Sequence, residues 1–414
     1  MRFNISIYIV YTVVLILILQ PLIVFAIPTI AYYDEIVALL FFGYYLLCVL
    51  KSGKISKSLL KLIGLITLLV IIGLIGNDKS QSGQSLVSVL TDIVSNTKLF
   101  LFAIPLFSFS FSFEKREQLM DWLATTIRIV ILCMFICASI SIFKDIGMSD
   151  EVRYGIRSFR FIFVNPAGLN TYFYSFMVVF SATLFKNGKL RPKSNFYMII
   201  AVITWILTLR SRAIAFACIY VLLYFLIIYY VNSKDTIKFR WYYLPPILVV
   251  ACLIGWPAFE EYFLLNSRQA RYVLLRGAIS LAKDYFPFGT GFATYGTSAS
   301  ATQYSSIYAR YGLSSVWGLG PDSSFFIMDQ FWCGILGQFG VLGTVLIAYL
   351  IYRLYKEVLR RSRGNKSLLL ASSTLIYTSL FASISAASYI QASIFISVFV
   401  IFVLTVPPVQ GAKE

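Results

Sequence analysis

Long apolar runs separated by short polar stretches make up most of this chain of 414 residues. A helix needs about 20 apolar residues to cross a bilayer, and runs of that kind recur from one end of the chain to the other. The pattern predicts twelve membrane spans, near residues 5–27, 29–50, 58–76, 85–111, 119–143, 168–186, 195–209, 213–232, 241–258, 326–352, 368–386 and 388–406. The chain therefore reads as an all-α polytopic membrane protein, with residues 1–414 forming a single transmembrane domain.

Alternate loops between these spans are short and rich in lysine and arginine. They read "KSGKISK", "EKRE", "KNGKLRPK", "NSKDTIKFR" and "YRLYKEVLRRSRGNK". Cytoplasmic loops of membrane proteins carry such an excess of Lys and Arg, so both termini are predicted to lie in the cytoplasm. The first apolar run exceeds the roughly 7–15 residues of a signal-peptide core, which favours a retained span.

One predicted outer loop, residues 259–325 between spans nine and ten, is much longer than the others. Loops of this length without spans are usually functional or disordered. Its Tyr and Phe content and its helical patterning predict a partly helical loop. No inverted pair of broken spans is recognisable, which weakens a transporter interpretation.

The amino-acid composition limits the class of protein and the kinds of ligand and cofactor that the chain can have. The chain is 59% hydrophobic and 13% charged, whereas soluble domains carry about 25% charge. The net charge of +17 is explained by the cytoplasmic loops, so a nucleic-acid partner is not predicted. All six cysteines lie in apolar runs and read as small buried hydrophobic residues. There is no histidine, which removes the commonest general base and metal ligand, and no cofactor or metal motif is present.

The predicted outer side nevertheless carries cations, which the orientation rule disfavours, and nearly all of them are arginines. They are Arg153, Arg157, Arg160, Arg210, Arg212, Arg268, Arg271, Arg276, Lys283 and Arg310. A guanidinium grips phosphate oxygens bidentately. At 100° per residue, Arg268, Arg271, Arg276 and Lys283 would share an arc of about 140° of one helix, mixed with apolar residues. One such arginine can simply extend to the headgroups, but three clusters indicate an anionic, lipid-linked ligand.

Two acids stand near the mouth of the tenth span. Asp322 follows Pro321, and Asp329 would lie on nearly the same helix face, about 10 Å deeper. Asp322 either caps the helix or acts as a general base. Asp329 either pairs with an arginine or takes part in catalysis, because ionisable residues inside spans are by default functional.

This constellation resembles the O-antigen polymerase and ligase family of lipid-linked glycan transferases. "RYVLLRGAISLAKDYFPFGTGF" is similar to the family's Arg-led segment closed by Pro-aromatic-Gly-x-Gly, with Arg271 and Arg276 at the arginine positions. "SRA" at 211–213 resembles the Ser-Arg-small motif, and "NPAGLN" at 165–170 resembles the Asn-Pro opening of a central span. Arg157 and Gly168 fit an Arg-x10-Gly spacing. These motifs cover about residues 150–345.

The ligases of this family carry a His-Asn pair before the span numbered ten here. This chain has Pro321-Asp322-Ser323-Ser324 at that place. The difference favours a polymerase, with Asp322 as the candidate base.

The resemblance implies a GT-C-like fold in the bacterial inner (plasma) membrane. It implies transfer of a growing glycan from undecaprenyl pyrophosphate onto the non-reducing end of a new lipid-linked repeat unit, on the outer face and without metal or cofactor. The expected catalytic residues are Asp322, Arg212, Arg271 and Arg276, and the expected substrate contacts are Arg157, Arg160, Arg210, Arg268 and Asp329. The implied partners are undecaprenyl-pyrophosphate-linked donor and acceptor oligosaccharides, a chain-length-regulating co-polymerase, a repeat-unit flippase and membrane lipids, with no nucleic acid.

Two alternatives remain at this stage. One is a ligase-type glycan transferase, which the missing histidine disfavours. The other is a lipid-linked oligosaccharide flippase, which is not an enzyme. A flippase needs a cationic central cavity and two similar halves, whereas the cations here cluster in outer loops.

Overall fold

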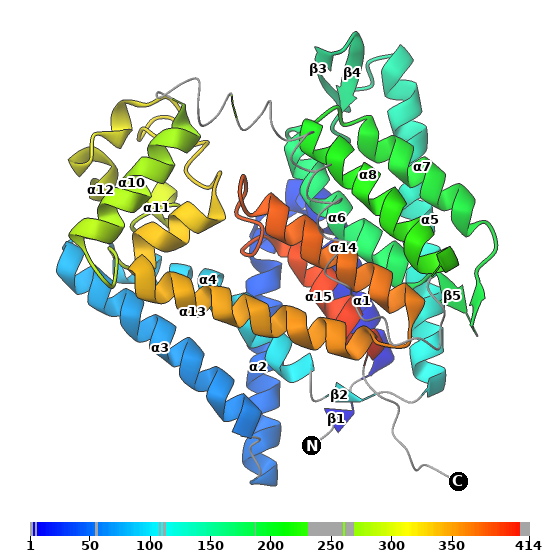
Figure 1. Ribbon diagram of the computed structural model, residues 1–414, viewed down its shortest axis with the longest axis horizontal. Helices are drawn as coiled ribbons and strands as arrows, with labels where there is room; N and C mark the ends of the chain where they lie inside the picture. The colour runs from blue at the N-terminus through cyan, green and yellow to red at the C-terminus, as the bar shows by residue number, and fades with distance from the viewer. Residues whose placement is uncertain are drawn as a thin grey trace.

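The computed structural model describes residues 3–4, 6–53, 57–106, 109–110, 113–186, 188–230, 260 and 269–405. In this part of the chain the fold is almost entirely helical (Figure 1). The helices are α1 (Ile7–Ala26), η1 (Pro28–Tyr32), α2 (Tyr33–Ser52), α3 (Lys57–Ser80), α4 (Leu86–Leu106), α5 (Phe113–Phe143), α6 (Pro166–Ala182), α7 (Ser194–Ile206), α8 (Ser211–Phe225), η2 (Leu226–Tyr230), α10 (Ala270–Asp284), α11 (Ser298–Thr302), α12 (Ser306–Arg310), η5 (Leu313–Ser315), α13 (Phe331–Ser362), α14 (Lys366–Ala382) and α15 (Ala392–Thr405).

Three two-stranded sheets complete the secondary structure. Strand β1 (Phe3–Asn4) pairs in parallel with β2 (Phe109–Ser110). The antiparallel pairs are β3 (Ser149–Arg153) with β4 (Ile156–Phe159), and β5 (Phe185–Lys186) with β6 (Lys189–Leu190). The β3–β4 hairpin occupies the loop before the sixth predicted span, where the sequence pattern indicated no strands. The amide of Phe159 donates to the carbonyl of Leu207, which seats the hairpin on the end of α7.

Seven helices of the described part are long and apolar enough to cross a membrane. They lie at Ile7–Val24, Thr29–Ser52, Leu59–Ser80, Leu86–Ala103, Glu114–Phe143, Ser211–Tyr229 and Phe331–Ser362. Helices α6, α7, α14 and α15, of 13 to 17 residues, occupy four further predicted spans but are shorter. The predicted ninth span, 241–258, lies outside the described residues. The all-α membrane architecture is thus confirmed in its coarse form.

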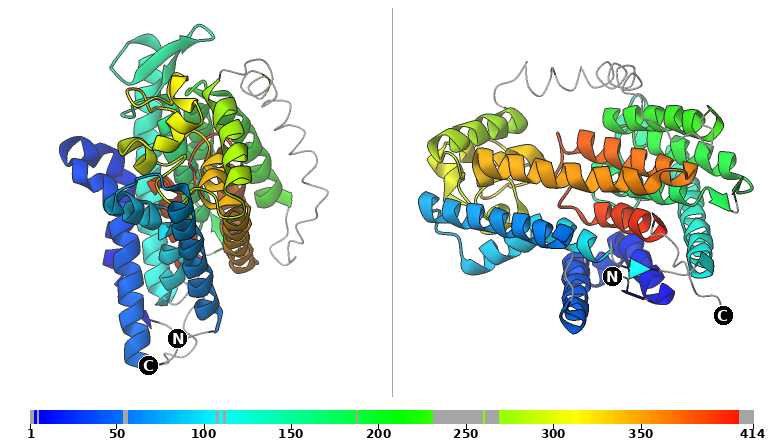
Figure 2. Two further views of the ribbon diagram at one scale, coloured as in Figure 1. Left: turned by 90° about the vertical axis from the view of Figure 1, so that its left-hand side faces the viewer. Right: turned by 60° about the horizontal axis from the view of Figure 1, so that its bottom comes forward.

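The buried core lies where α6, α14 and α15 pack together and where α1, α2 and α4 close around α15. Helix α13 packs on α3, α10 and α14, so it links this core to a second, smaller cluster formed by the outer segment 269–330. In Figure 1, α10, α11 and α12 stand together above α3 and α4, and the hairpin β3–β4 stands at the other end. Figure 2 shows α13 running from the α10–α12 group across the bundle. Between 269 and 325 the predicted outer loop is partly helical, as expected.

The Pro-Phe-Gly-Thr-Gly-Phe segment after α10 locks onto a break in α13. Gly340 has non-helical angles (φ 58°, ψ −160°), so the helical hydrogen-bond ladder is interrupted there. The amides of Thr290 and Gly291 donate to the carbonyls of Gly337 and Gln338, at 3.0 and 2.7 Å, and the amide of Leu342 donates to the carbonyl of Pro287 at 3.3 Å. Buried backbone groups must be paired, and here the 287–291 segment and α13 supply hydrogen-bond partners to each other. We call this arrangement the α10–α13 lock.

Helix α4 holds the same segment from beneath. Asp92, which is buried in α4, accepts hydrogen bonds through Oδ2 from the amide of Ala293 (2.7 Å) and from Nε2 of Gln338 (2.6 Å). Farther along α4, Lys98 forms buried ion pairs with Asp34 and Glu35 at the start of α2. Asp92 and Lys98, two ionisable residues inside the fourth predicted span, are therefore paired inside the bundle.

Candidate functional site

Arg271, in the first turn of α10, forms an ion pair with Asp329, which directly precedes α13. The distance from Nη2 to Oδ2 is 3.1 Å, and the side chains are 23% and 27% exposed. An arginine and a carboxylate at this spacing form a charge-assisted hydrogen bond. The pairing of Asp329 with an arginine was one of its two predicted roles.

Arg212 brings a second cation to this place from the first turn of α8. Its Nη1 donates to Oγ of Ser385 at 2.7 Å, and its charge acts on Asp329. Arg212 also interacts with the hydroxyl of Tyr174 in α6. We call Arg212, Arg271 and Asp329 the arginine–aspartate centre.

The loop between α14 and α15 fixes the geometry of this centre. The amide of Phe331 donates to the carbonyl of Ser383 (3.2 Å), and Nε1 of Trp332 donates to Oγ of the same serine (2.9 Å). Ser385, two residues later, accepts a hydrogen bond from Arg212. The loop therefore ties the start of α13, beside Asp329, to the start of α8.

All the helix ends that meet at this centre are predicted to lie on the same side of the membrane. In the twelve-span scheme, the starts of α6, α8 and α13 and the loop from α14 to α15 lie on the outer side of the membrane. The structure brings these ends together at one end of the bundle. The centre draws on four separate segments, which sequence spacing alone does not reveal.

Burial raises the pKa of Asp329 above its ordinary value, although the charges of Arg271 and Arg212 act in the opposite direction. Desolvation disfavours the charged carboxylate, and nearby cations favour it. A carboxylate with a raised pKa is a better proton acceptor than a solvated one near neutral pH. The centre thus combines two guanidinium groups with a group able to take a proton.

Asp322 lies apart from this pattern. It is exposed, in a turn where Gly320 and Ser323 form an isolated bridge. The prediction that Asp322 and Asp329 share a helix face is wrong, as is the predicted start of the tenth span near 326, because α13 begins at Phe331. Asp322 does not cap α13 either, since the N-cap position belongs to Gln330.

Arg276 turns away from the centre. It is exposed, and its guanidinium lies 5.9 Å from the ring centroid of Tyr272. Five residues of helix place it about 140° around α10 from Arg271. The two arginines of the same sequence motif therefore face different surroundings. Arg268, the remaining arginine of this motif, lies outside the described residues.

The hairpin arginines serve mainly local contacts. The guanidinium of Arg160 donates to the carbonyls of Gly147, Ser149, Phe163 and Val164 at 2.9–3.1 Å. Four carbonyl partners leave it little capacity for a phosphate. This geometry favours a structural role for Arg160.

Arg210 and Arg157 lie near acidic side chains in and beside the β3–β4 hairpin. Arg210 lies 3.6 Å from Asp150 and 3.5 Å from Glu151. Hydrogen bonds from Gly147 and Ser149, and the charges of Arg157 and Arg160, lower the pKa of Asp145 beside this hairpin. The substrate roles of these two arginines stay predictions.

Sequence reasoning missed Ser385 and Tyr174. Both lie in apolar segments, where a serine or tyrosine is common, and nothing in the spacing separates them from their neighbours. In the described part of the chain, no three side chains of Cys, Asp or Glu lie together as metal ligands would. No family model, curated protein or solved structure matches this chain.

Proposed function

We propose that this protein is a glycan polymerase that uses lipid-linked pyrophosphates on the outer face of a bacterial inner membrane. The observation that carries the proposal is the arginine–aspartate centre: Arg212 and Arg271 meet a partly buried carboxylate, Asp329, at the predicted outer end of the bundle. The proposal includes a twelve-span GT-C-like fold with cytoplasmic termini. A chain-length-regulating co-polymerase and a repeat-unit flippase would act alongside it.

In the proposed reaction, the acceptor hydroxyl oxygen attacks the anomeric carbon of the donor glycan. The bond from that carbon to the pyrophosphate oxygen breaks, and the pyrophosphate leaves with the bonding electrons on its undecaprenyl carrier. Arg212 and Arg271 stabilise the charge that develops on the departing oxygen. Losing one preorganised donor of this kind typically costs about 10²–10³ in rate.

The hydroxyl proton passes to a carboxylate, and the surroundings of Asp329 favour it over Asp322 for this role. Asp329 has a raised pKa and lies beside both arginines, whereas Asp322 is exposed in a turn. In this proposal the pyrophosphate displaces Asp329 from Arg271, which frees the carboxylate to accept the proton. Arg276 is exposed beside Tyr272, on another face of α10.

The test is elongation by the purified full-length protein in liposomes. Lipid-linked repeat units are supplied without nucleotide or metal, and the product length is read on a polysaccharide gel. Long polymer is expected from the wild type and from Arg153→Ala, a control arginine that pairs with Glu151 on the hairpin. Arg212→Ala and Arg271→Ala should yield only unextended units.

The rival functions give different products in the same liposomes. A flippase moves lipid-linked units across the bilayer and leaves their length unchanged. A ligase transfers one glycan to a lipid acceptor and produces no ladder. Either result, or full ladders from both arginine variants, would refute the proposed polymerase mechanism.

A further inference from the structure

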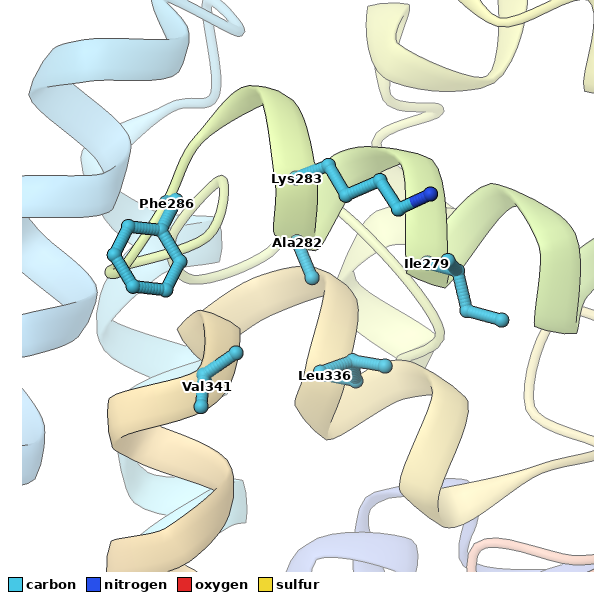
Figure 3. A pocket seen from close by; sticks show the side chains of 6 residues that line it. All are labelled: Ile279, Ala282, Lys283, Phe286, Leu336 and Val341. Atoms are coloured by element: carbon cyan, nitrogen blue, oxygen red, sulfur yellow. The ribbon is translucent and has the colours of Figure 1, made fainter.

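An open groove with a volume of about 450 Å³ lies between the end of α10 and the first half of α13 (Figure 3). Its lining residues are Ile279, Ala282, Lys283, Phe286, Leu336 and Val341. Five of the six are apolar, and Lys283 is the one charged residue among them. The volume falls in the range of about 300–1,000 Å³ that small-molecule sites occupy.

The groove opens onto an apolar surface. Phe286 is 66% exposed and Val341 is 44% exposed. Below Val341, exposed Val345, Tyr349 and Tyr352 follow at helical spacing and form one stripe along α13. A long hydrocarbon chain that enters the groove can therefore continue along α13 through the depth of the bilayer.

Lys283 of α10 lines this groove, and Arg276 lies nearer the start of α10 on the same helix face, beside Tyr272. Lys283 lies seven residues after Arg276, which places them about 20° apart on the helix and about 10 Å apart along it. Both are exposed, and Figure 3 shows the Lys283 side chain extended along α10 above the groove. The neighbouring acid, Asp284, accepts a hydrogen bond from the hydroxyl of Tyr311 at 2.7 Å.

Helix α10 therefore has two cationic faces. Arg271 points to Asp329, and Lys283 is about 120° away around the helix, beside the apolar groove. A polymerase of the proposed kind must hold two substrates at once, and each has a pyrophosphate and an isoprenoid chain. One cationic face serves one pyrophosphate, and the Lys283 face has an apolar groove beside it.

We propose that this groove binds the isoprenoid chain of the acceptor, with the acceptor's pyrophosphate against Lys283 and Arg276, while the donor's pyrophosphate occupies the arginine–aspartate centre. This inference rests on the proposed polymerase function. It predicts that the two lipid-linked substrates bind on opposite sides of α10. It also gives Arg276 a role as an acceptor-binding residue.

The first test measures binding to the full-length protein in phosphatidylcholine nanodiscs with a fluorescent C20 prenyl diphosphate as the probe. The wild type should bind two probes. Lys283→Ala removes the cation and Val341→Trp fills the groove, so each of these variants should bind one probe. Arg271→Ala should retain the groove site. Ile203→Trp, at a 40% exposed position of α7, is the matched control and should bind two.

Two binding results would overturn the inference. One is retention of both sites in Lys283→Ala and Val341→Trp. The other is displacement of the probe by phosphatidylglycerol as readily as by unlabelled prenyl diphosphate, since the groove would then be an ordinary phospholipid site. Thermal unfolding of each variant in detergent separates lost binding from lost folding, and Lys283→Gln and Arg276→Gln provide milder changes.

The second test separates this inference from the proposed function. In the elongation assay, Lys283→Ala should raise the KM for the acceptor about 10- to 100-fold, as expected for loss of a charged hydrogen bond, and leave the donor KM unchanged. A raised donor KM would overturn the assignment. If the wild type elongates nothing but Lys283→Ala still loses a prenyl diphosphate site, the polymerase proposal fails and the groove remains a prenyl diphosphate site without the acceptor role.

Discussion

The outer arginines differ in what their guanidinium groups already bind. Arg160 donates to four backbone carbonyls, whereas Arg212 donates to a serine hydroxyl and Arg271 pairs with a carboxylate. Four carbonyls that lose one shared donor need new partners, but a side-chain partner can move aside for a phosphate. Arginines that look alike in sequence therefore differ in whether backbone or side-chain groups hold them.

This division predicts opposite phenotypes for two arginine variants. Arg160→Ala should lower the thermal unfolding temperature in detergent and reduce the yield of folded protein, because four carbonyls lose a donor. Arg212→Ala should keep the wild-type unfolding temperature within a few degrees and lose elongation by about 10²–10³. An Arg160→Ala protein that is fully stable would show that its carbonyl contacts contribute little.

The raised pKa of Asp329 predicts the pH dependence of elongation. A base is active only when deprotonated, so kcat/KM should fall as the pH drops through the folded-state pKa, which lies above the usual value of about 3.9. Arg271 lowers this pKa, so Arg271→Gln should move the acid limb to higher pH. A shift to lower pH would contradict the assignment, and Asp329→Asn should remove the limb.

Protein stability offers an independent check on Asp329. A raised pKa means that the folded protein binds this proton more tightly than the unfolded chain does. The associated stabilisation is present at low pH and is lost as the pH rises through the folded pKa. Asp329→Asn should therefore show a weaker loss of stability over that pH range than the wild type in chemical unfolding.

At the scale of elements, the α10–α13 lock gives the Pro-aromatic-Gly-x-Gly motif a physical meaning. Gly291 has φ +90°, and a Cβ built there would lie 2.2 Å from the backbone nitrogen of Asn77 in α3. Gly289 is similarly close to Gly340, at 2.4 Å from its nitrogen. The glycines allow backbone to touch backbone, so the motif positions α10 against α3 and α13.

Gly291→Ala should therefore destabilise the protein by about 3 kcal/mol or more, from a steric clash added to left-handed strain. Gly312 is the matched control, since it has φ +68° with no atom within 4 Å of the added Cβ, and Gly312→Ala should cost only about 1–2 kcal/mol. Comparing the unfolding temperatures of the two variants measures the packing part. Equal losses would mean that close packing at Gly291 adds nothing.

Sequence patterning predicted the helices well and the ends of α13 poorly. Apolar runs of membrane length depend only on composition, so the segments from α1 to α8 were recognisable. Residues 326–330 directly precede the apolar run and were predicted to belong to the helix, but they form turns, with the amide of Phe326 bonded to the carbonyl of Gly318 in the outer segment. Asp322 was singled out for its place after a proline, but tertiary contacts bring Asp329 to the two arginines.

At the scale of the whole molecule, the structure joins ends that the charge pattern assigns to one side. The sidedness itself is predicted from lysine and arginine in loops, and it decides whether the arginine–aspartate centre faces the outer leaflet. Arg212 and Arg271 are 59 residues apart in sequence, so only the arrangement of α8, α10 and α13 brings them to one carboxylate. Local sequence spacing contains no record of that arrangement.

Cysteine labelling in intact cells tests the sidedness. In a background without native cysteines, a cysteine at exposed Ser315 should react with a membrane-impermeant maleimide. A cysteine at exposed Arg363, in the loop between α13 and α14, should react only after the membrane is permeabilised. The reverse pattern would place the centre in the cytoplasm and exclude a reaction on the outer face.

The α10–α13 lock also limits how this protein can move. Pulling the 287–291 segment from α13 would strand several backbone groups in an apolar interior, at about 1–3 kcal/mol each. The Tyr285 end of α10 therefore acts as a fixed pivot, and its opposite end, which carries Arg271, is joined to the α13 side by the ion pair with Asp329. If α10 swings during a reaction cycle, it swings about that pivot, and the largest displacement falls on the arginine that holds Asp329.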